Sequence, residues 1–301
     1  RTGELDKPRE EAWQRAFSGN GISHRLFKYW YFRASVLKRY QHGTISADQR
    51  EAETLWQYGL AEERCRETNR RLYGALHNSA LIPPHTVALL KRARKVILNV
   101  LGEVQYDEVF RGFAFSTGAT TEMRRRDAAI AHKWEKGSHI HVGGVALYNA
   151  FLNWCEGSRF LRGLDKLVRQ DEGHFFSVLK NYKANRGCET QPTLTMALQK
   201  AVAGCMKNRA RRVGLLKTDA QQYHAELARE GSRTGRLTTA DLENASNSLA
   251  LALPLALLEG TRWWRLLLAT RVERVRMPGG HSIVLEKISS MGNGWTFELQ
   301  T

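Results

Sequence analysis

The sequence predicts an α+β fold in which a mainly helical region precedes a smaller mixed region. From Glu11 to about Gly173, apolar residues recur at helical spacing among residues that favour helices. After residue 236, a short strand pattern, a helical run, a hairpin pattern and a glycine-rich loop lead to a last helical segment. The predicted domains are therefore residues 1–173, 174–236 and 237–301.

Two helices are predicted most clearly in the first region. One is the stretch QREAETLWQYGLAEERCRETNRRLYGAL at residues 49–76, which is rich in good helix formers. The other begins at Pro83 and Pro84 and ends before Gly102, since proline suits the first helical turn and glycine the position after the last. The basic residues within 91–95 favour a solvated face of this helix, with a face toward RNA as the alternative.

The composition indicates a partner that carries many negative charges. The 301 residues include 46 Lys and Arg against 30 Asp and Glu, a net charge of +16, and 42% of them are hydrophobic, enough for a folded core. A ribosomal or coat protein would share this excess, so the charge indicates a class of partner and no activity. The longest apolar run, residues 249–258, is shorter than the roughly 20 residues that cross a bilayer, so no membrane association is predicted.

The two ends of the sequence and its cysteines add context. The chain begins with Arg1 rather than Met and ends with Thr301 inside an apolar pattern, which is typical of a fragment of a longer polypeptide. The first residues contain no secretory signal. The cysteines form no C-x-x-C pair and predict free thiols in cytosolic surroundings; they are Cys65, Cys155, Cys188 and Cys205.

Half of the excess charge lies in one segment, residues 180–236. Its twelve Lys and Arg against four Asp and Glu give 12 − 4 = +8 in 57 residues. Such a concentration is expected of a channel for nucleic acid or triphosphate, and an exposed helix is the alternative. Lys180, Lys183 and Arg186 recur every three residues in an extended or looped stretch, a pattern suited to contacting several phosphate oxygens.

The last region carries the residues best placed for chemistry. Leu237–Ala240 is predicted as a short strand with Asp241 at its end, and Ser246 or Ser248 as the cap of the next helix. A carboxylate in such a place suits Mg²⁺, which prefers oxygen ligands and acts in pairs in polymerases. An isolated Asp at a strand end is, however, more often a cap or turn residue.

A hairpin and a glycine-rich loop follow. Residues 271–288 alternate around a Pro-Gly-Gly turn and predict a β-hairpin. The loop SSMGNG at residues 289–294 combines glycines, which permit close backbone approach, with polar groups for a ribose hydroxyl or a template backbone. An ordinary tight turn is the structural alternative. The residues concerned are Ser289, Ser290, Gly292, Asn293 and Gly294.

Three other features predict less specific sites. The loop FAFSTGATTEMRRRD at residues 113–127 suits a phosphate only weakly. His139 and His141 lack a nearby cysteine or carboxylate cluster, so a metal site is disfavoured. Trp263 and Trp264 offer stacking for bases, but packing of a helix is favoured, with the flanking arginines reaching solvent.

Taken together, these stretches resemble a known family. DLENASNSLALALPLALL, EKISSMGNGWTFEL and the spacing from the first to the hairpin are similar to the RNA-directed RNA polymerase subunit of the single-stranded RNA phages, the leviviruses of the Q-beta group. In that family an equivalent Asp-Leu-x-x-Ala-Ser-x-Ser element is motif A, and Ser-Ser-Met-Gly-Asn-Gly-x-Thr-Phe-Glu is motif B. VLKNYKANRGCETQP resembles motif F, a basic segment that binds the incoming nucleotide. AEERCRETNRRL and FSTGATTEMRR extend the resemblance, which runs from about Ala61 to the end.

The resemblance implies a fold, a cofactor and residue roles. The fold would be a helical N-terminal and fingers region followed by an incomplete right-hand palm. Asp241 would be the catalytic residue that binds the metal, Mg²⁺ or alternatively Mn²⁺. The residues that would bind nucleotide are Lys180, Lys183, Arg186, Asn247, Ser289, Ser290, Gly292, Asn293 and Thr296.

The chain departs from the family pattern in three respects. Asn247 stands where the family has a second acidic residue of motif A, and Gln191 stands where motif F has Glu before Pro. No Gly-Asp-Asp sequence occurs, although polymerases of this kind need its carboxylates for two metal ions. We therefore expect residues 1–301 alone to be inactive or nearly so in RNA synthesis.

The predicted function is thus part of a viral replicase that adds nucleotides to an RNA 3′-hydroxyl. The implied partners are RNA template and product, nucleoside triphosphates, and the host translation elongation factors Tu and Ts, in the cytoplasm of the bacterial host. A basic RNA-binding or assembly protein without catalysis is the alternative, and a degenerate replicase is a third reading.

Overall fold

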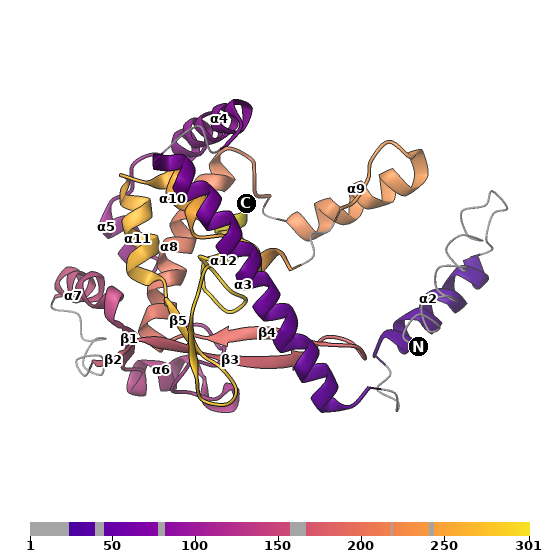
Figure 1. Ribbon diagram of the computed structural model, residues 1–301, viewed down its shortest axis with the longest axis horizontal. Helices are drawn as coiled ribbons and strands as arrows, with labels where there is room; N and C mark the ends of the chain where they lie inside the picture. Colours follow the sequence, from indigo (N-terminus) through magenta and orange to yellow (C-terminus); the bar gives the residue numbers. More distant parts are fainter. Residues whose placement is uncertain (1–23, 40–44, 78–81, 157–166, 218, 241–243) are drawn as a thin grey trace. The chain divides into compact units, whose positions relative to one another are not determined.

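Figure 1 shows a computed structural model of the chain, which describes residues 24–39, 45–77, 82–156, 167–217, 219–240 and 244–301. Contacts divide the chain into two units. One comprises Arg1–Trp56 and Ser177–Arg186, and the other comprises Gln57–Phe176 and Gly187–Thr301. The second unit contains the main hydrophobic core.

The first unit contains α2 (His24–Arg39), the start of α3 (Ala47–His77), and the turn between β3 (Glu172–Leu179) and β4 (Asn185–Thr190). α3 begins with a capping box: Ser46 Oγ accepts a hydrogen bond from the Gln49 amide at 3.1 Å, and Gln49 Oε1 accepts one from the Ser46 amide at 2.8 Å. α3 covers the whole helix predicted at residues 49–76, which is confirmed.

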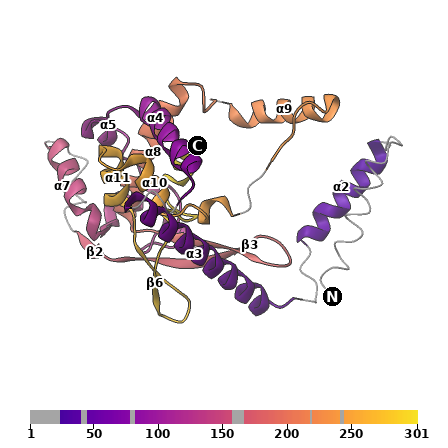
Figure 2. The ribbon, with the colours of Figure 1, turned by 45° about the horizontal axis from the view of Figure 1, so that its top comes forward.

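The core of the second unit is arranged around α8 (Thr193–Arg212). Leu194, Ala197, Leu198 and Ala201 of this helix are fully buried. A helix that is apolar on most of its sides must be surrounded by other elements. Figures 1 and 2 show helices gathered around α8, and it contacts α4 (Pro84–Leu101), α5 (Tyr106–Phe110), α11 (Arg262–Thr270) and α12 (Thr296–Gln300).

α4 confirms the helix predicted after residue 83. It begins at Pro84, and Gly102, at φ 57°, follows its last residue with its amide donating to the Leu98 carbonyl at 2.8 Å. Trp263 is buried against this end, where its indole N–H donates to the Gly102 carbonyl at 2.8 Å. The predicted packing role of Trp263 is therefore confirmed.

Four strands form the larger sheet in the order β4-β3-β5-β6, with β5 at Arg274–Arg276 and β6 at Ser282–Val284. β3 and β5 are parallel, whereas β5 and β6 are antiparallel and confirm the predicted hairpin. The turn of this hairpin contains Gly279 and Gly280 at φ 94° and 88°, a conformation that favours glycine. A separate parallel pair joins β1 (His139–His141) to β2 (Val168–Gln170).

Shorter helices connect these elements. They are α6 (Ile130–Lys136), α7 (Val145–Trp154), α9 (Ala220–Thr234) and α10 (Ala252–Leu258), with 3-10 turns η3 (Arg125–Asp127), η4 (Val142–Gly144) and η6 (Ala245–Asn247). Many helices with two small sheets confirm the α+β class. Among the helices of the described ranges, none has the length and apolar character needed to cross a membrane.

The predicted strand at Leu237–Ala240 is wrong. α9 ends at Thr234, Gly235 adopts φ 66°, and the residues up to Ala240 are exposed and form no regular structure. Leu237 is 43% exposed. A strand is stabilised by a neighbouring strand, and no strand of the described residues pairs with this segment.

The predicted helix cap at Ser246 or Ser248 is also wrong. Residues 245–247 form the turn η6, and the next helix, α10, begins only at Ala252 without a side-chain cap. Ser248 Oγ donates to the Ala245 carbonyl at 3.0 Å instead. The helix of the apolar run that follows therefore begins later than a cap at either serine would place it.

Candidate functional site

A cavity of about 340 Å³ lies beside the glycine-rich loop at residues 289–294. Four parts of the second unit form its walls: the loop itself, Phe176 of β3, the region where β4 leads into α8, and the segment at residues 116–119. The residues used below are Ser116, Gly118, Glu189, Lys200, Gly292 and Asn293.

The loop packs so closely on β4 that glycine is required at one position. Gly292 has φ 127°, and a Cβ atom there would overlap the Glu189 carbonyl oxygen. The Glu189 amide donates to the Met291 carbonyl at 2.8 Å, so the two backbones are in direct contact. Gly294 lies as closely against α8, where an added Cβ would be 2.9 Å from Gln199 Cβ. The close approach that these glycines permit is therefore to the protein itself.

The polar side chains of the loop mainly hold its own shape. Asn293 Oδ1 accepts from the Ser290 amide at 3.0 Å, and Thr296 Oγ1 donates to the Ser290 carbonyl at 3.0 Å. Ser290 Oγ donates to a carboxylate oxygen of Glu189. Ser289 Oγ is buried and has no hydrogen-bond partner among the described residues. Gly292, Asn293 and Gly294 are thus the loop residues that line the cavity.

A buried lysine holds another part of the cavity wall, the segment at residues 116–118. Lys133 of α6 donates through Nζ to the carbonyl oxygens of Ser116 at 2.6 Å and of Gly118 at 2.5 Å. Burial lowers the pKa of Lys133, and the carboxylate of Glu122 partly offsets that effect. These bonds place the Ser116 and Gly118 region where it bounds the cavity.

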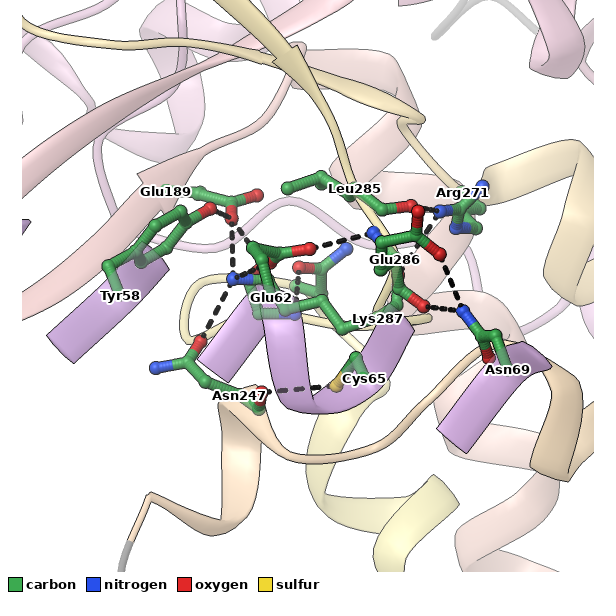
Figure 3. A network of polar contacts seen from close by, with 12 residues as sticks. Tyr58, Glu62, Cys65, Asn69, Glu189, Asn247, Arg271, Leu285, Glu286 and Lys287 are labelled. Atoms are coloured by element: carbon green, nitrogen blue, oxygen red, sulfur yellow. Dashed lines mark hydrogen bonds and ion pairs between the residues drawn. The ribbon is translucent and has the colours of Figure 1, made fainter. Parts of the chain in front are cut away.

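A second buried lysine, Lys287, precedes the loop by two residues in the sequence, and Figure 3 shows its polar contacts. Its Nζ is 2.9 Å from Glu62 Oε1, 3.4 Å from Glu189 Oε1 and 3.6 Å from the ring centroid of Tyr58. Tyr58 also donates through its hydroxyl to Glu189, and burial followed by the Glu189 charge raises the pKa of Tyr58 well above its usual value. Burial likewise raises the pKa of the neighbouring Cys65 thiol to about 11.

These contacts determine the charge that the cavity presents. The Glu189 carboxylate is taken up by Ser290, Tyr58 and Lys287. Lys200 forms no ion pair within the part of the chain that the structure describes, so its ammonium is the main charge on the wall. Small polar groups and one cation suit a polar ligand that carries negative charge.

Comparison with known proteins decides the family. A sequence profile described as RNA replicase, beta-chain, matches residues 4–301. The chain belongs to this family. It is 32% identical over 295 residues to the RNA-directed RNA polymerase subunit beta of Enterobacteria phage SP, and 31% identical over 279 residues to that of Escherichia virus Qbeta. A third relative, the RNA-directed RNA polymerase beta chain of Escherichia phage MS2, is 30% identical over 302 residues.

The three alignments cover 97%, 91% and 94% of this chain, but 50%, 46% and 52% of the relatives. The chain therefore spans about half the length of the curated relatives it matches. The resemblance to the phage polymerase subunits that the motifs indicate is confirmed.

In this chain, the predicted motif F residues lie at or next to a hairpin tip of the first unit. Lys180 is exposed before the turn, and the Lys183 ammonium is 5.4 Å from the ring centroid of Tyr182. Asn181 shapes the turn, because its Oδ1 accepts from the amides of Lys183 and Ala184, both at 2.9 Å.

The hairpin is tied to the first turns of α3 by its next residues. The Asn185 amide donates to Thr54 Oγ1 at 3.0 Å, and its side chain donates to Glu51 Oε2 at 2.9 Å. Arg186 follows on β4 with an exposed side chain. Three cations thus lie close together in sequence, at the turn and at the start of β4, and their role in binding phosphates stays a prediction.

The predicted metal-binding residue, Asp241, lies outside the described residues. Asn247 lies in η6, half-buried, with its Oδ1 3.4 Å from Lys287 Nζ. Among the described residues, no three His, Cys, Asp or Glu side chains are grouped as a metal site would need. The role of Asp241 stays a prediction.

Sequence reasoning missed the buried charges. Glu62, Glu189 and Lys287 come from distant segments, and no local motif joins them. One signal was nevertheless present: Ile283, Leu285 and Lys287 alternate along the hairpin, so the pattern that directs the first two side chains inward directs the lysine inward as well. A lysine on an inward face predicts a buried partner of opposite charge.

Proposed function

We propose that this chain forms the nucleotide- and RNA-handling part of an RNA-directed RNA polymerase that replicates a viral RNA genome. The observation that carries the proposal is the family match across residues 4–301, together with relatives that are named as polymerase subunits. The net charge of +16 and the cavity at the glycine-rich loop support it.

In the complete subunit, the reaction would be templated nucleotidyl transfer. The 3′-hydroxyl oxygen of the RNA attacks the α-phosphorus of a nucleoside triphosphate, the bond to the bridging oxygen breaks, and pyrophosphate leaves. Such chemistry depends on positioning and on neutralising the triphosphate charge. In this proposal Lys180, Lys183 and Arg186 bind the triphosphate, while Gly292 and Asn293 bound the space for nucleotide and template.

The metal enters the proposal through one residue, Asp241. Mg²⁺, or alternatively Mn²⁺, would screen the phosphates, and Asp241 is its proposed ligand in this chain. The described residues present no further ligand set for it. We therefore assign no reaction step to the metal, and the right-hand palm and fingers and the three domain boundaries likewise stay proposals.

The test is binding of a fluorescent nucleoside triphosphate with and without Mg²⁺. We expect Mg²⁺ to strengthen binding and Asp241→Ala to abolish that strengthening. Asp219→Ala, which removes another carboxylate before α9, is the matched control and should bind as the unchanged chain does. Equal Mg²⁺-dependence in both variants would contradict the metal role, and no nucleotide binding at all would favour a basic RNA-binding or assembly protein.

A second test concerns activity. Because residues 1–301 contain no Gly-Asp-Asp sequence, we propose that they synthesise no RNA by themselves. RNA synthesis from primed and unprimed templates measures this, and activity of the 301 residues alone would refute it. Action in the host cell, and association with host elongation factors Tu and Ts, are proposals for the complete subunit that co-purification tests.

A further inference from the structure

The ammonium group of Lys287 is completely enclosed. The residue is 0% exposed, and Nζ is in contact with two carboxylates, an aromatic ring and the Asn247 side chain. Lysine is almost never buried without partners, because removing the charge from water is costly. The contacts of Lys287 must therefore form together with the surrounding fold.

The partners of Lys287 come from three parts of the chain. Tyr58 and Glu62 lie on α3, Glu189 on β4, and Asn247 in η6 (Figure 3). Lys287 itself stands two residues before Ser289, where the glycine-rich loop begins. One ammonium group thus joins α3, β4 and η6 at the base of the loop.

The backbone around Lys287 is held from two sides. On the α3 side, Glu62 Oε2 accepts from the Glu286 amide at 2.7 Å, and Asn69 donates to the Glu286 carbonyl at 2.7 Å. On the other side, Arg271 donates through Nη2 to the carbonyls of Leu285 at 2.6 Å and of Lys287 at 3.1 Å. The segment that enters the loop therefore has little freedom to shift.

Glu189 connects this group to the loop directly. One carboxylate oxygen contacts Lys287 and accepts from Ser290 Oγ, and the Glu189 amide donates to the Met291 carbonyl. Without Lys287 the buried Glu189 carboxylate would lose its nearest cation, which would weaken the support that this residue gives the loop.

The charges around Lys287 also explain the amide at residue 247. Glu62 and Glu189 already place two negative charges around one ammonium. An aspartate at 247 would bring a third carboxylate to the same enclosed group, which like-charge repulsion disfavours. Asn247 supplies an oxygen to Lys287 without a charge, and Figure 3 shows its amide nitrogen turned away from the ammonium.

We propose that Lys287 is a positioning residue for the glycine-rich loop, and that Asn247 is the neutral member its two carboxylate partners require. The inference rests on the proposed function for its consequence, namely that the loop geometry sets nucleotide affinity. The arrangement of the loop itself is independent of that function and is measured separately.

Hydrogen exchange of the amides at residues 288–296 measures the loop. We expect Lys287→Met to speed this exchange by roughly tenfold or more, because the loop would open locally, and Lys287→Arg to restore part of the protection. Arg209→Met is the matched control, since it breaks another partly buried ion pair, to Glu108 at 2.6 Å, away from the loop. It should leave loop exchange unchanged.

The charge requirement is tested without removing the lysine. Asn247→Asp should speed loop exchange, and Asn247→Asp combined with Glu189→Gln should reverse part of that effect, because the number of carboxylates returns to two. Loop exchange within twofold of the unchanged chain in both Lys287→Met and Asn247→Asp would overturn the proposal. The proposal would also be overturned if the loop of the double variant exchanged as fast as the effects of its two single changes, added together, predict.

Nucleotide binding separates this inference from the proposed function. If Lys287→Met speeds hydrogen exchange of the loop and weakens nucleotide affinity several-fold, both the positioning role and the proposed function are supported. If the unchanged chain binds no nucleotide while Lys287→Met still frees the loop, the proposed function fails and the positioning role stands. If nucleotide binds normally and the loop is not freed, the positioning role alone is refuted.

Discussion

Gly292 is the loop residue at which the structure has least space for a side chain. Its φ of 127° already favours glycine, and a Cβ atom would overlap the Glu189 carbonyl oxygen. We expect Gly292→Ala to lower the free energy of unfolding by about 3 kcal/mol, because strain and overpacking add. Chemical denaturation with tryptophan fluorescence measures this.

Two further glycines separate the causes. Gly214 has φ 76° with no atom within 4 Å of an added Cβ, so Gly214→Ala reports backbone strain alone, about 1 kcal/mol. Gly204 lies inside α8 with equal space, so Gly204→Ala should stabilise by about 0.5–1 kcal/mol. If Gly292→Ala proves no worse than Gly214→Ala, the loop does not pack on β4 as described.

His141 makes folding sensitive to acid. Burial lowers the pKa of His141 below its ordinary 6.5, and nearby carboxylates only partly offset this. In the unfolded chain His141 keeps its ordinary pKa of 6.5, so below that pH the unfolded chain binds a proton more readily than the folded chain does. The free energy of unfolding therefore falls as the pH drops through 6.5. We expect the melting temperature to fall between about pH 7.5 and about pH 5.5, and less steeply in His141→Gln.

The control variant, Thr195→Val, keeps the His141 imidazole and removes a hydrogen bond to the His141 backbone. Thr195 Oγ1 accepts from the His141 amide at 2.7 Å, so Thr195→Val should destabilise at every pH without flattening the slope. Burial also lowers the pKa of His174, and the combined His141→Gln, His174→Gln chain should show the smallest acid effect. An unchanged slope in His141→Gln would exclude its role.

At the scale of elements, the hairpin tip between β3 and β4 and the helix α4 compete as RNA contacts. The hairpin tip carries three exposed or half-buried cations, and α4 carries four. We expect Lys180→Ala, Lys183→Ala and Arg186→Ala together to lower the slope of log affinity for single-stranded RNA against log salt by about 2, since each phosphate contact contributes about 0.7. Fluorescence anisotropy over a salt series measures the slope.

The matched variant removes three exposed cations of α4. Lys91→Ala, Arg92→Ala and Lys95→Ala leave Arg94 in place, because its guanidinium donates to the Glu259 carbonyl at 2.7 Å. We expect this triple change to leave the slope almost unaltered, as a solvated face would. A drop as large as that of the hairpin variant would instead show that α4 faces RNA.

The elements that the sequence predicted well are those whose signals are local. Periodicity and end residues fixed α3 and α4, and alternation around Pro-Gly-Gly fixed the hairpin β5–β6. The strand at Leu237–Ala240 failed because pairing, unlike helix formation, depends on a partner elsewhere in the chain. The predicted start of α10 was wrong because Ser246 and Ser248 suit an N-cap position, whereas the helix begins at Ala252 without a side-chain cap.

The same distinction holds for the candidate site. The loop at 289–294 was found from its own residues, and so was the cationic tip at 180–186. The supports were not, since Lys133 holds carbonyls 15 and 17 residues away, and Tyr58 reaches Glu189 across 131 residues. Contacts between residues so far apart produce no recognisable pattern in a single sequence. The inward position of Lys287 could nevertheless have been predicted from the alternation of the hairpin.

At the scale of the whole molecule, the excess of positive charge is distributed very differently from the buried charge. The surface carries most of the +16, whereas the enclosed group around Lys287 has two carboxylates for one ammonium. The exposed cations attract a polyanion over distance, and the buried acids act only on the fold. The two sets of charges therefore serve different purposes, and their effects are expected to respond differently to salt.

The enclosed ammonium also bears on the order of events at the ribosome. Glu62 is synthesised 287 − 62 = 225 residues before the lysine that compensates it, and Glu189 precedes that lysine by 287 − 189 = 98 residues. Until the hairpin emerges, a nascent chain that brought these two acids together would confine repelling groups in an apolar setting. We therefore expect the contacts of Lys287 with α3 to form only after residue 287 has been synthesised.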